Sequence, residues 1–328
     1  MSTVNDLIDV RVDDATNEVR DLISGLSGAP RLIPTVYGYD ERGSELYAQI
    51  CDMKTYYPYH AEWDLLTRNV NSICDLANVS EIIELGCGTA TKSELLLNRM
   101  SAESRASLKY VPIDVSEEML RKTSARLADS IDGLEIDPIA GDYHSGLSVV
   151  EQRPKASRLF LFMGSSLGNM SEEKRHELLK NIRAAGRRGD LMLVGVDFDK
   201  PRPVLETAYN DPPGYDLWHH FLTNRLACLN SMFHGDFDPS AFDSRLTYNT
   251  DAFRMEAQIW PRSSDIEFHL ADLNLRGVIK AGERVTVDTS HKFKPDELNE
   301  LLDSTGMRIM EAYEESAVKY SLLLLEMT

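Results

Sequence analysis

The stretch from Glu84 to Thr89, with the sequence ELGCGT, constrains the fold more than any other part of the chain. It follows a short β-branched run and precedes a helical pattern of leucines at 95–97, so we expect a strand, a tight turn and a helix. Gly86 and Gly88 allow positive φ at the turn and let a ligand approach the backbone closely. A dinucleotide-binding turn would carry a third glycine where this chain has Thr91. The turn therefore predicts a different nucleoside ligand, and the acid that opens the motif suits one with positive charge.

Acidic residues also end the next two predicted strands. Asp114 closes a strand over 108–114, where a carboxylate of a doubly wound sheet reaches a ribose diol. Asp142 follows a strand over 134–140, and there an acid can accept a hydrogen bond from an adenine amino group while Tyr143 covers the ring. Each acid alone is equally well explained as a helix N-cap. Three acids in register along alternating strands and helices favour an adenosyl cofactor.

The middle of the chain alternates predicted helices and strands, which implies a parallel sheet with helices on both faces. The predicted helices cover 61–77, 92–100, 116–128 and 172–185, and the predicted strands cover 81–86, 108–114, 134–140, 158–164 and 190–197. A helix over 295–304 and strands over 307–313 and 320–327 follow near the end of the sequence. These last strands fit an antiparallel hairpin that closes the sheet. We therefore expect an α/β fold with a doubly wound, Rossmann-like sheet.

Residues 198–290 differ in character from the parts on either side. They are aromatic-rich and helical over 201–235 and then form short alternating strand patterns over 245–290. Such a segment is an insertion in a cofactor-binding domain, and we expect it to pack with the first 60 residues. The predicted division is a cofactor-binding domain of residues 62–197 and 291–328, and a second, α+β domain of residues 8–61 and 198–290 that binds the substrate.

Composition excludes several classes of function. The net charge is −18 and basic residues do not cluster, so a nucleic-acid partner is not expected. We expect neither a signal peptide over residues 1–14 nor a membrane-spanning stretch, because long apolar runs are missing. The four cysteines are scattered, which fits reduced thiols in the cytoplasm and gives no metal-binding spacing. The adjacent His219 and His220 diverge on a helix, so we expect no metal. A cytoplasmic monomer with a small-molecule substrate is the expected form.

With these motifs in view, the chain resembles the histidine-specific methyltransferases that use S-adenosylmethionine (SAM) to convert L-histidine to its trimethylbetaine, hercynine, in ergothioneine biosynthesis. The resemblance rests on an ordered set of motifs over nearly the full length: YDERGS at 39–44, YYP at 56–58, ELGCG at 84–88 with Lys92, PIDVS at 112–116, GSSLGN at 164–169, GVD at 195–197, AYND at 208–211, DFD at 236–238 and SHKF at 290–293. It implies a class I methyltransferase sheet with SAM as cofactor, a separate substrate-binding domain, and N-methylation of a free amino acid.

The resemblance also implies roles for single residues. The cofactor contacts that it implies, together with those that the glycine turn itself suggests, are Glu84, Gly86, Gly88, Lys92, Asp114, Asp142 and Tyr143. Asn169 and Tyr209 match the residues that hold the α-amino and α-carboxylate groups of the amino acid. Tyr39 and Tyr56 match catalytic tyrosines at the reacting end of the pocket. Buried packing is the commoner role of a tyrosine, and the resemblance favours the site.

Two positions depart from the family pattern at the place where the side chain of the substrate binds. Ala257 stands where the family typically has methionine and Asp288 where it has glutamate, whereas Ser290 keeps the family serine. Both changes shorten a side chain, so we expect a larger pocket with a deeper carboxylate. The substrate is then L-histidine or a larger amino acid such as tryptophan or arginine, with Asp288 meeting the indole N–H or the guanidinium. A SAM-binding protein without catalysis is a third alternative, which the retained substrate anchor disfavours.

Overall fold

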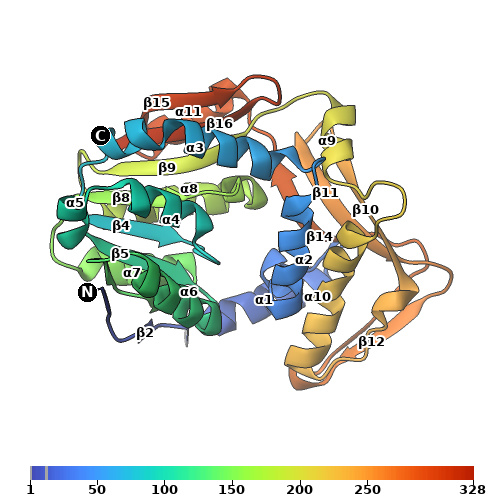
Figure 1. Cartoon of the computed structure of the whole chain (residues 1–328). Coiled ribbons are helices and arrows are strands. Elements are labelled where there is room, and N and C mark those ends of the chain that lie inside the picture. The colour runs from blue at the N-terminus through green and yellow to red at the C-terminus, as the bar shows by residue number, and fades with distance from the viewer. Residues whose placement is uncertain (1, 12–13) are drawn as a thin grey trace. The chain divides into compact units, whose positions relative to one another are not determined.

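The computed structural model describes residues 2–11 and 14–328, and its contacts divide the chain into two compact units (Figure 1). Unit 1 comprises Met1–Ala15, Ala61–Phe198 and Phe293–Thr328, and unit 2 comprises Thr16–His60 and Asp199–Lys292. The predicted stretch 8–61 includes residues 12 and 13, which lie outside the described residues. Its beginning also differs from the prediction, because β2 (Ile8–Asp9) pairs in parallel with β7 (Ile139–Ala140) and so belongs to unit 1.

Unit 1 is built on a mixed sheet with the strand order β1-β6-β5-β4-β8-β9-β16-β15, in which β7 also pairs with β5 and β2 pairs with β7. Its other strands are β1 (Thr3–Val4), β4 (Glu81–Leu85), β5 (Lys109–Asp114), β6 (Glu135–Ile136), β8 (Arg158–Phe162), β9 (Leu191–Asp197), β15 (Met307–Glu315) and β16 (Tyr320–Met327). Strands β4, β5, β8 and β9 pair in parallel. Strand β16 lies antiparallel between β9 and β15. The predicted doubly wound sheet and its closing hairpin are confirmed.

The helices of unit 1 alternate with these strands, as the sequence predicts. They are α3 (Tyr57–Leu76, whose first turn belongs to unit 2), α4 (Thr91–Arg99), α5 (Ala102–Ala106), α6 (Glu117–Ser130), α7 (Tyr143–Gln152), the short η2 (Ser166–Asn169), α8 (Glu172–Ala185) and α11 (Pro295–Ser304). Leucine and isoleucine side chains of α7, α8 and α11 share one buried core with alternate residues of the strands, such as Ile83 and Val111. Helix α6 packs against β5, β6 and β7.

Two of the differences between unit 1 and the sequence prediction have a clear physical reason. The predicted strand over 134–140 is split into β6 and β7, since Pro138 between them has no N–H for a ladder. Helix α7 was not predicted, because Gly146 disfavours a helix interior. The structure explains this glycine: a Cβ there would lie 2.5 Å from a side-chain carbon of Ile113 in β5. Gly146 therefore lets α7 approach the sheet closely.

Unit 2 combines helices with a four-stranded sheet in the order β10-β11-β14-β3 and a separate hairpin of β12 and β13. Its elements are α1 (Asp14–Ser27), β3 (Arg31–Leu32), η1 (Thr35–Gly38), α2 (Glu41–Asp52), α9 (Arg202–Ala208), α10 (Leu217–Phe233), η3 (Pro239–Ala241), β10 (Phe242–Asn249), β11 (Arg254–Pro261), β12 (Ile266–Leu270), η4 (Ala271–Leu273), β13 (Leu275–Ile279) and β14 (Val285–His291). The helices expected over 201–235 and the short strands expected over 245–290 are both present.

Helix α10 forms the centre of unit 2. Ten of its 17 residues are buried, on all sides of the helix, as expected for a helix without a polar face. The carboxylate of Asp211 accepts hydrogen bonds from the backbone N–H groups of Trp218 and His219, at 3.1 and 3.3 Å, and so caps the first turn. The buried set includes Arg225, a cation inside an otherwise apolar core.

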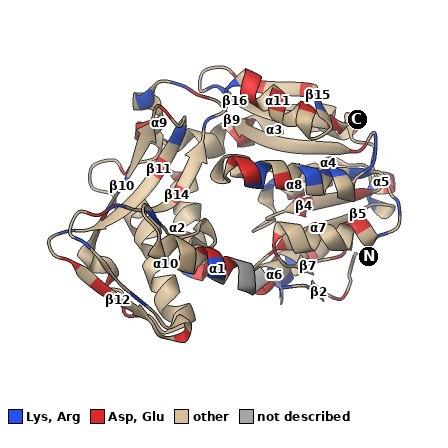
Figure 2. Ribbon diagram, turned by 180° about the vertical axis from the view of Figure 1, so that it is seen from behind, with Lys and Arg blue, Asp and Glu red and all other residues tan. Residues whose placement is uncertain are grey.

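Several further features bear on function. No helix among residues 2–11 and 14–328 is long and apolar enough to cross a membrane. Within the same described residues, no group of three or more His, Cys, Asp or Glu side chains is placed to hold a metal ion. The four cysteines are free thiols. Acidic and basic residues are interspersed, for instance along α8 (Figure 2).

Candidate functional site

The glycine turn lies between β4 and α4 in unit 1, as predicted. Gly86 has a φ of 70° and Gly88 a φ of 48°, in the left-handed region that favours glycine. A Cβ at Gly86 would lie 3.0 Å from the hydroxyl oxygen of Tyr143, whereas a Cβ at Gly88 would have no atom within 4 Å. The turn thus brings Gly86 and Tyr143 together and leaves open space beside Gly88.

Asp114, at the end of β5, is held by the turn next to it. Its Oδ2 accepts a hydrogen bond from the backbone N–H of Gly88 at 2.9 Å, and its Oδ1 accepts one from the N–H of Ser116 at 3.0 Å. Burial raises the pKa of Asp114, against the lowering effect of these N–H groups. A carboxylate oxygen has two lone pairs, so each oxygen retains acceptor capacity toward a ribose diol.

Asp142 and Tyr143 adjoin this turn at the start of α7. Asp142 caps the helix, because its Oδ1 accepts hydrogen bonds from the backbone N–H and the hydroxyl of Ser145, at 2.7 and 2.9 Å. The ring of Tyr143 lies edge-on to Phe162, with 5.4 Å between ring centroids. Helix capping is therefore sufficient to explain the acidic side chain at position 142. A contact between Asp142 and the adenine of the cofactor remains a prediction.

Glu84 of β4 faces the interior of unit 1 rather than solvent. Its carboxylate accepts a hydrogen bond from the hydroxyl of Tyr110 on the neighbouring strand. Burial raises the pKa of Glu84 from 4.5 to about 7, although the hydrogen bond from Tyr110 lowers it. The charge of this carboxyl therefore changes near neutral pH.

The sequence analysis did not identify Glu62, which lies at the centre of a buried polar cluster in unit 1. Its fully buried carboxylate accepts the N–H of Gly164, 2.9 Å from each oxygen, and the hydroxyl of Tyr320 at 2.7 Å. Lys92, a predicted cofactor contact, forms an ion pair with the same carboxylate. A Cβ at Gly195 would lie only 1.9 Å from Oε1 of Glu62, so this glycine makes room for the cluster.

This cluster joins α4 to the loop that carries Asn169. The loop begins at Gly164, with a φ of 79°, and continues into η2, which ends at Asn169. A sequence signal for Glu62 did exist, because Leu65 and Leu66 follow it at the spacing of one helix face. An acid on the apolar face of a helix is expected to have a buried partner.

In unit 2, the structure brings three of the predicted tyrosines into one aromatic cluster. The cluster consists of Tyr39, Tyr47, Tyr56, Tyr209, Trp218 and Phe221. Tyr56 meets both Tyr209 and Trp218 edge-on, with 5.5 Å between centroids in each case. Tyr56 is 5% exposed, and burial raises its pKa well above the ordinary value, so the phenol stays protonated. Tyr39 is 37% exposed.

Tyr209 and Ser290 are oriented by a lysine that the sequence analysis quoted in a motif without giving it a role. The ammonium of the fully buried Lys292 donates hydrogen bonds to the hydroxyl of Tyr209 and to the hydroxyl of Ser290, each at 2.9 Å. The two hydroxyl oxygens lie 3.3 Å apart. This contact is itself a hydrogen bond, so one of the two hydroxyls donates to the other, and the remaining hydroxyl hydrogen can be donated to an acceptor.

Ala257 and Asp288 are paired neighbours on β11 and β14, and Ala257 is 1% exposed. The predicted role of Asp288, a contact with the substrate, meets an obstacle. Its carboxylate already forms an ion pair with Arg225 at 2.9 Å and accepts the hydroxyl of Thr35 at 3.1 Å. Burial raises the pKa of Asp288, and the nearby guanidinium opposes this shift. The sequence analysis did not identify Arg225 as the partner of Asp288.

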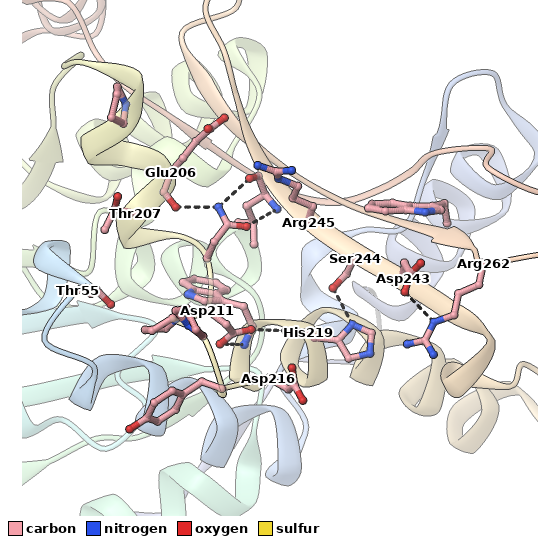
Figure 3. A pocket seen from close by; sticks show the side chains of 18 residues that line it. Thr55, Glu206, Thr207, Asp211, Asp216, His219, Asp243, Ser244, Arg245 and Arg262 are labelled. Atoms are coloured by element: carbon pink, nitrogen blue, oxygen red, sulfur yellow. Dashed lines mark hydrogen bonds and ion pairs between the residues drawn. The ribbon is translucent and has the colours of Figure 1, made fainter.

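A cavity of about 920 Å³ also lies in unit 2, between α9, the start of α10 and strands β10 and β11 (Figure 3). None of the predicted site residues lines it, although it shares Trp218 with the aromatic cluster. Charged groups at its wall serve the fold: Asp211 caps α10 and Asp243 pairs with Arg262 at 2.7 Å. We therefore assign no ligand to this cavity.

Unit 1 combines a glycine turn, acids at the ends of successive parallel strands, and a sheet closed by an antiparallel hairpin. This combination is that of a class I methyltransferase, whose cofactor contains a nucleoside. The family of histidine-specific, SAM-dependent methyltransferases matches residues 18–327, and the chain belongs to this family. The predicted fold class, the methyltransferase activity and the cofactor SAM are thereby confirmed.

Individual relatives agree with this assignment. The chain is 31% identical over 307 residues to the histidine N-alpha-methyltransferase of Mycobacterium tuberculosis, with 93% of each chain covered. It is also 31% identical over 305 residues to the enzyme of the same name from Mycolicibacterium smegmatis, again with 93% of each covered. A more distant relative is an L-tryptophan methyltransferase of Psilocybe serbica, 26% identical over 335 residues, with 92% of this chain and 90% of the relative covered.

The residues of unit 1 fit the cofactor. Gly88 leaves open space at the turn, and the buried Asp114 beside it has acceptor capacity for two ribose hydroxyls. Glu84 faces the interior of unit 1 and accepts from Tyr110, and a contact between Glu84 and the cofactor remains a prediction. Lys92 is paired with Glu62, and a direct contact between Lys92 and the cofactor remains a prediction.

Proposed function

We propose that the protein transfers methyl groups from SAM to the α-amine of free L-histidine, forming hercynine. In this proposal unit 1 binds the cofactor and contributes Asn169, and unit 2 contributes the other contacts with the amino acid. The observation that carries it is the buried Lys292, which donates to the hydroxyls of both Tyr209 and Ser290, while these two hydroxyls are hydrogen-bonded to each other. A hydroxyl donor backed by a buried ammonium suits the α-carboxylate of an amino acid.

The chemistry asks little of the protein beyond binding and orientation. SAM, when bound, supplies an electrophilic methyl group, and the α-amine must be neutral and in line with it. We assign Asn169 and Tyr209 to the α-amino and α-carboxylate groups. Tyr56 stays protonated, so it serves as a hydrogen-bond donor and leaves the amine proton to water. The rings of Tyr39 and Tyr56 also stabilise a methylammonium by cation–π contact, by about 0.5–2 kcal/mol each.

The test is a turnover screen of the twenty amino acids with SAM, followed by mass spectrometry of the product. We expect L-histidine to be the best acceptor and the product to carry three added methyl groups on the α-nitrogen. Histamine, which lacks the carboxylate, should be a poor acceptor, and Tyr209→Phe should raise KM for histidine by about 10- to 100-fold through loss of a charge-assisted hydrogen bond. Equal turnover of histamine and histidine would reject the carboxylate anchor.

L-Tryptophan is the second candidate substrate. Ala257 is buried beside Asp288, where a small side chain leaves room for a larger ring, and one of the relatives is an L-tryptophan methyltransferase. The double variant Ala257→Met with Asp288→Glu would restore the residues typical of the family. If this variant leaves the ranking of histidine, tryptophan and arginine unchanged, the two positions do not determine selectivity.

We further propose that the enzyme acts as a monomer in the cytoplasm on a small molecule and not on nucleic acid. The free state of all four cysteines and the net charge of −18 support this proposal. Light scattering coupled to size exclusion tests the oligomeric state, and a mass of twice 37.0 kDa would contradict it.

A further inference from the structure

Arg225 is a cation enclosed in the core of unit 2. Its side chain is fully buried, and it comes from the middle of α10. A buried guanidinium is costly unless its charge and its N–H groups are matched. The partners of this side chain therefore define what surrounds it.

Two flat surfaces hold the guanidinium in place. The ring of Phe221 lies on one side, with 4.8 Å between the Cζ of Arg225 and the ring centroid. A Cβ at Gly38 would lie 2.7 Å from the same Cζ, so only glycine fits at that position. Phe221 also meets Tyr39 edge-on at 5.6 Å, which places the guanidinium next to the aromatic cluster.

The charge of Arg225 is balanced by Asp288. The Oδ2 of Asp288 accepts from Nη2 of Arg225 at 2.9 Å, while its Oδ1 accepts from Thr35 and from the backbone N–H of Thr289, at 3.1 and 2.8 Å. Asp288 therefore has no uncompensated charge to offer. A substrate with a cationic side chain would meet a neutral pair whose cation repels it.

One nitrogen of the Arg225 guanidinium makes no hydrogen bond to the described residues. Its Nη1 donates to the carbonyl of Phe221 at 3.2 Å and its Nη2 to Asp288, whereas Nε is buried and makes no hydrogen bond within the described part of the chain. Buried donors are nearly always satisfied in folded proteins, and this unpaired Nε–H belongs to the arginine that pairs with Asp288, a predicted substrate contact.

We propose that Arg225 determines the side-chain selectivity of this enzyme, by neutralising Asp288 and by donating its Nε–H to an acceptor atom on the side chain of the substrate. This inference rests on the proposed amino-acid substrate and narrows it. A neutral imidazole has one nitrogen with a free lone pair, whereas an indole N–H and a guanidinium offer donors alone. The pair thus selects histidine against tryptophan and arginine.

The experiment compares L-histidine with L-3-(2-thienyl)alanine, whose ring has a similar size and no strong acceptor. For the unaltered enzyme we expect kcat/KM for histidine to exceed that for thienylalanine by at least about 100-fold. Arg225→Lys keeps the charge opposite Asp288 and removes the Nε–H. It should lower kcat/KM for histidine by about 10- to 100-fold, mainly through KM, and leave thienylalanine within about threefold.

Two controls separate selectivity from stability. Arg262→Lys alters an arginine of unit 2 whose partner Asp243 is half-exposed, and it should leave both substrates unaffected. If Arg225→Lys does not fold, judged by thermal melting and by calorimetric SAM binding, the charge-neutral double variant Arg225→Met with Asp288→Asn replaces it. The double variant should equally lose the preference for histidine.

The outcomes are distinct. A loss confined to histidine supports the inference, as does calorimetry showing weaker histidine binding to Arg225→Lys in the presence of S-adenosylhomocysteine. An equal loss for both substrates assigns Arg225 a structural role and overturns the inference. Equal use of histidine and thienylalanine by the unaltered enzyme also overturns it while leaving the proposed function intact. An enzyme that binds SAM and methylates no amino acid rejects both.

Discussion

Glu62 is the position in unit 1 where a single substitution should have the largest effect on stability. Its fully buried carboxylate accepts from Gly164, Tyr320 and Lys92, so its removal leaves three donors without their acceptor. Breaking a buried ion pair by deleting one partner costs about 3–5 kcal/mol, which we expect for Glu62→Ala. Glu62→Gln keeps one acceptor oxygen but places an amide NH₂ group next to other hydrogen-bond donors. We therefore expect it to lower the free energy of unfolding by about 2–3 kcal/mol.

The assay is urea unfolding combined with hydrogen exchange of the segment 158–169, which contains the amide of Gly164. The exchange of this segment should accelerate in Glu62→Gln, because the Gly164 N–H loses its charged acceptor. A second substitution, Lys92→Met, should cost less in the Glu62→Gln background than alone, with a coupling above about 1 kcal/mol. Glu135→Gln is the matched control, since its pair with Lys109 is about 40% exposed on both sides and is expected to contribute less than about 1 kcal/mol.

A cost for Glu62→Gln no larger than that of the control would refute the reasoning. So would strict additivity with Lys92→Met, because the two residues would then not depend on each other. Calorimetry adds a functional readout. If Lys92 serves mainly to hold Glu62, Lys92→Met should lower SAM affinity only indirectly. The loss of affinity should then follow the increase in hydrogen exchange of the loop after Gly164.

Three other predictions concern the cofactor site. Burial raises the pKa of Glu84 from 4.5 to about 7, so its protonated form stabilises the protein below pH 4.5 and this contribution is lost as the pH rises to 7. Glu84→Gln should therefore gain about 3 kcal/mol of stability relative to the unaltered chain across that window, at about 1.4 kcal/mol per pH unit; a pH-independent difference in urea midpoints would contradict this. Gly86→Ala should weaken calorimetric SAM binding, because its φ of 70° is strained for alanine and the new methyl group would lie 3.0 Å from the Tyr143 hydroxyl. Asp114→Asn should lower SAM affinity by about 10- to 100-fold through loss of charge-assisted bonds to the ribose, and undiminished affinity would reject the assignment.

The parts of the fold that the sequence predicted are those specified by neighbouring residues. Alternating periodicities located the sheet of unit 1, and the glycine turn located one end of it. Helix α7 was not predicted because Gly146 has a low helix propensity. This glycine is favourable only because it lets the helix pack closely against Ile113, more than 30 positions earlier in the sequence. Local propensity and tertiary packing disagree at that glycine, and packing determines the outcome.

The candidate site was predictable to the extent that it consists of motif residues. Tyr56 and Tyr209 lie in one cluster as expected. The pair formed by Arg225 and Asp288 was not predictable, because the two residues are 63 positions apart and neither belongs to a local pattern that requires the other. The family resemblance implies a contact between Asp288 and the substrate, which stays a prediction, and the structure adds an ion pair between Asp288 and Arg225. The one sequence signal was a single arginine in an otherwise largely apolar helix, which indicates a buried acidic partner.

The place of β16 in the sheet has a consequence for biosynthesis. Its residues, Tyr320–Met327, are translated long after β9, yet the strand lies inside the sheet, between β9 and β15. Until it emerges from the ribosome, β9 presents the unpaired edge of Leu191–Asp197, seven buried residues in the finished protein. An apolar strand edge of this kind is a template for aggregation. The nascent chain therefore needs protection by a chaperone from the synthesis of β9 until that of β16.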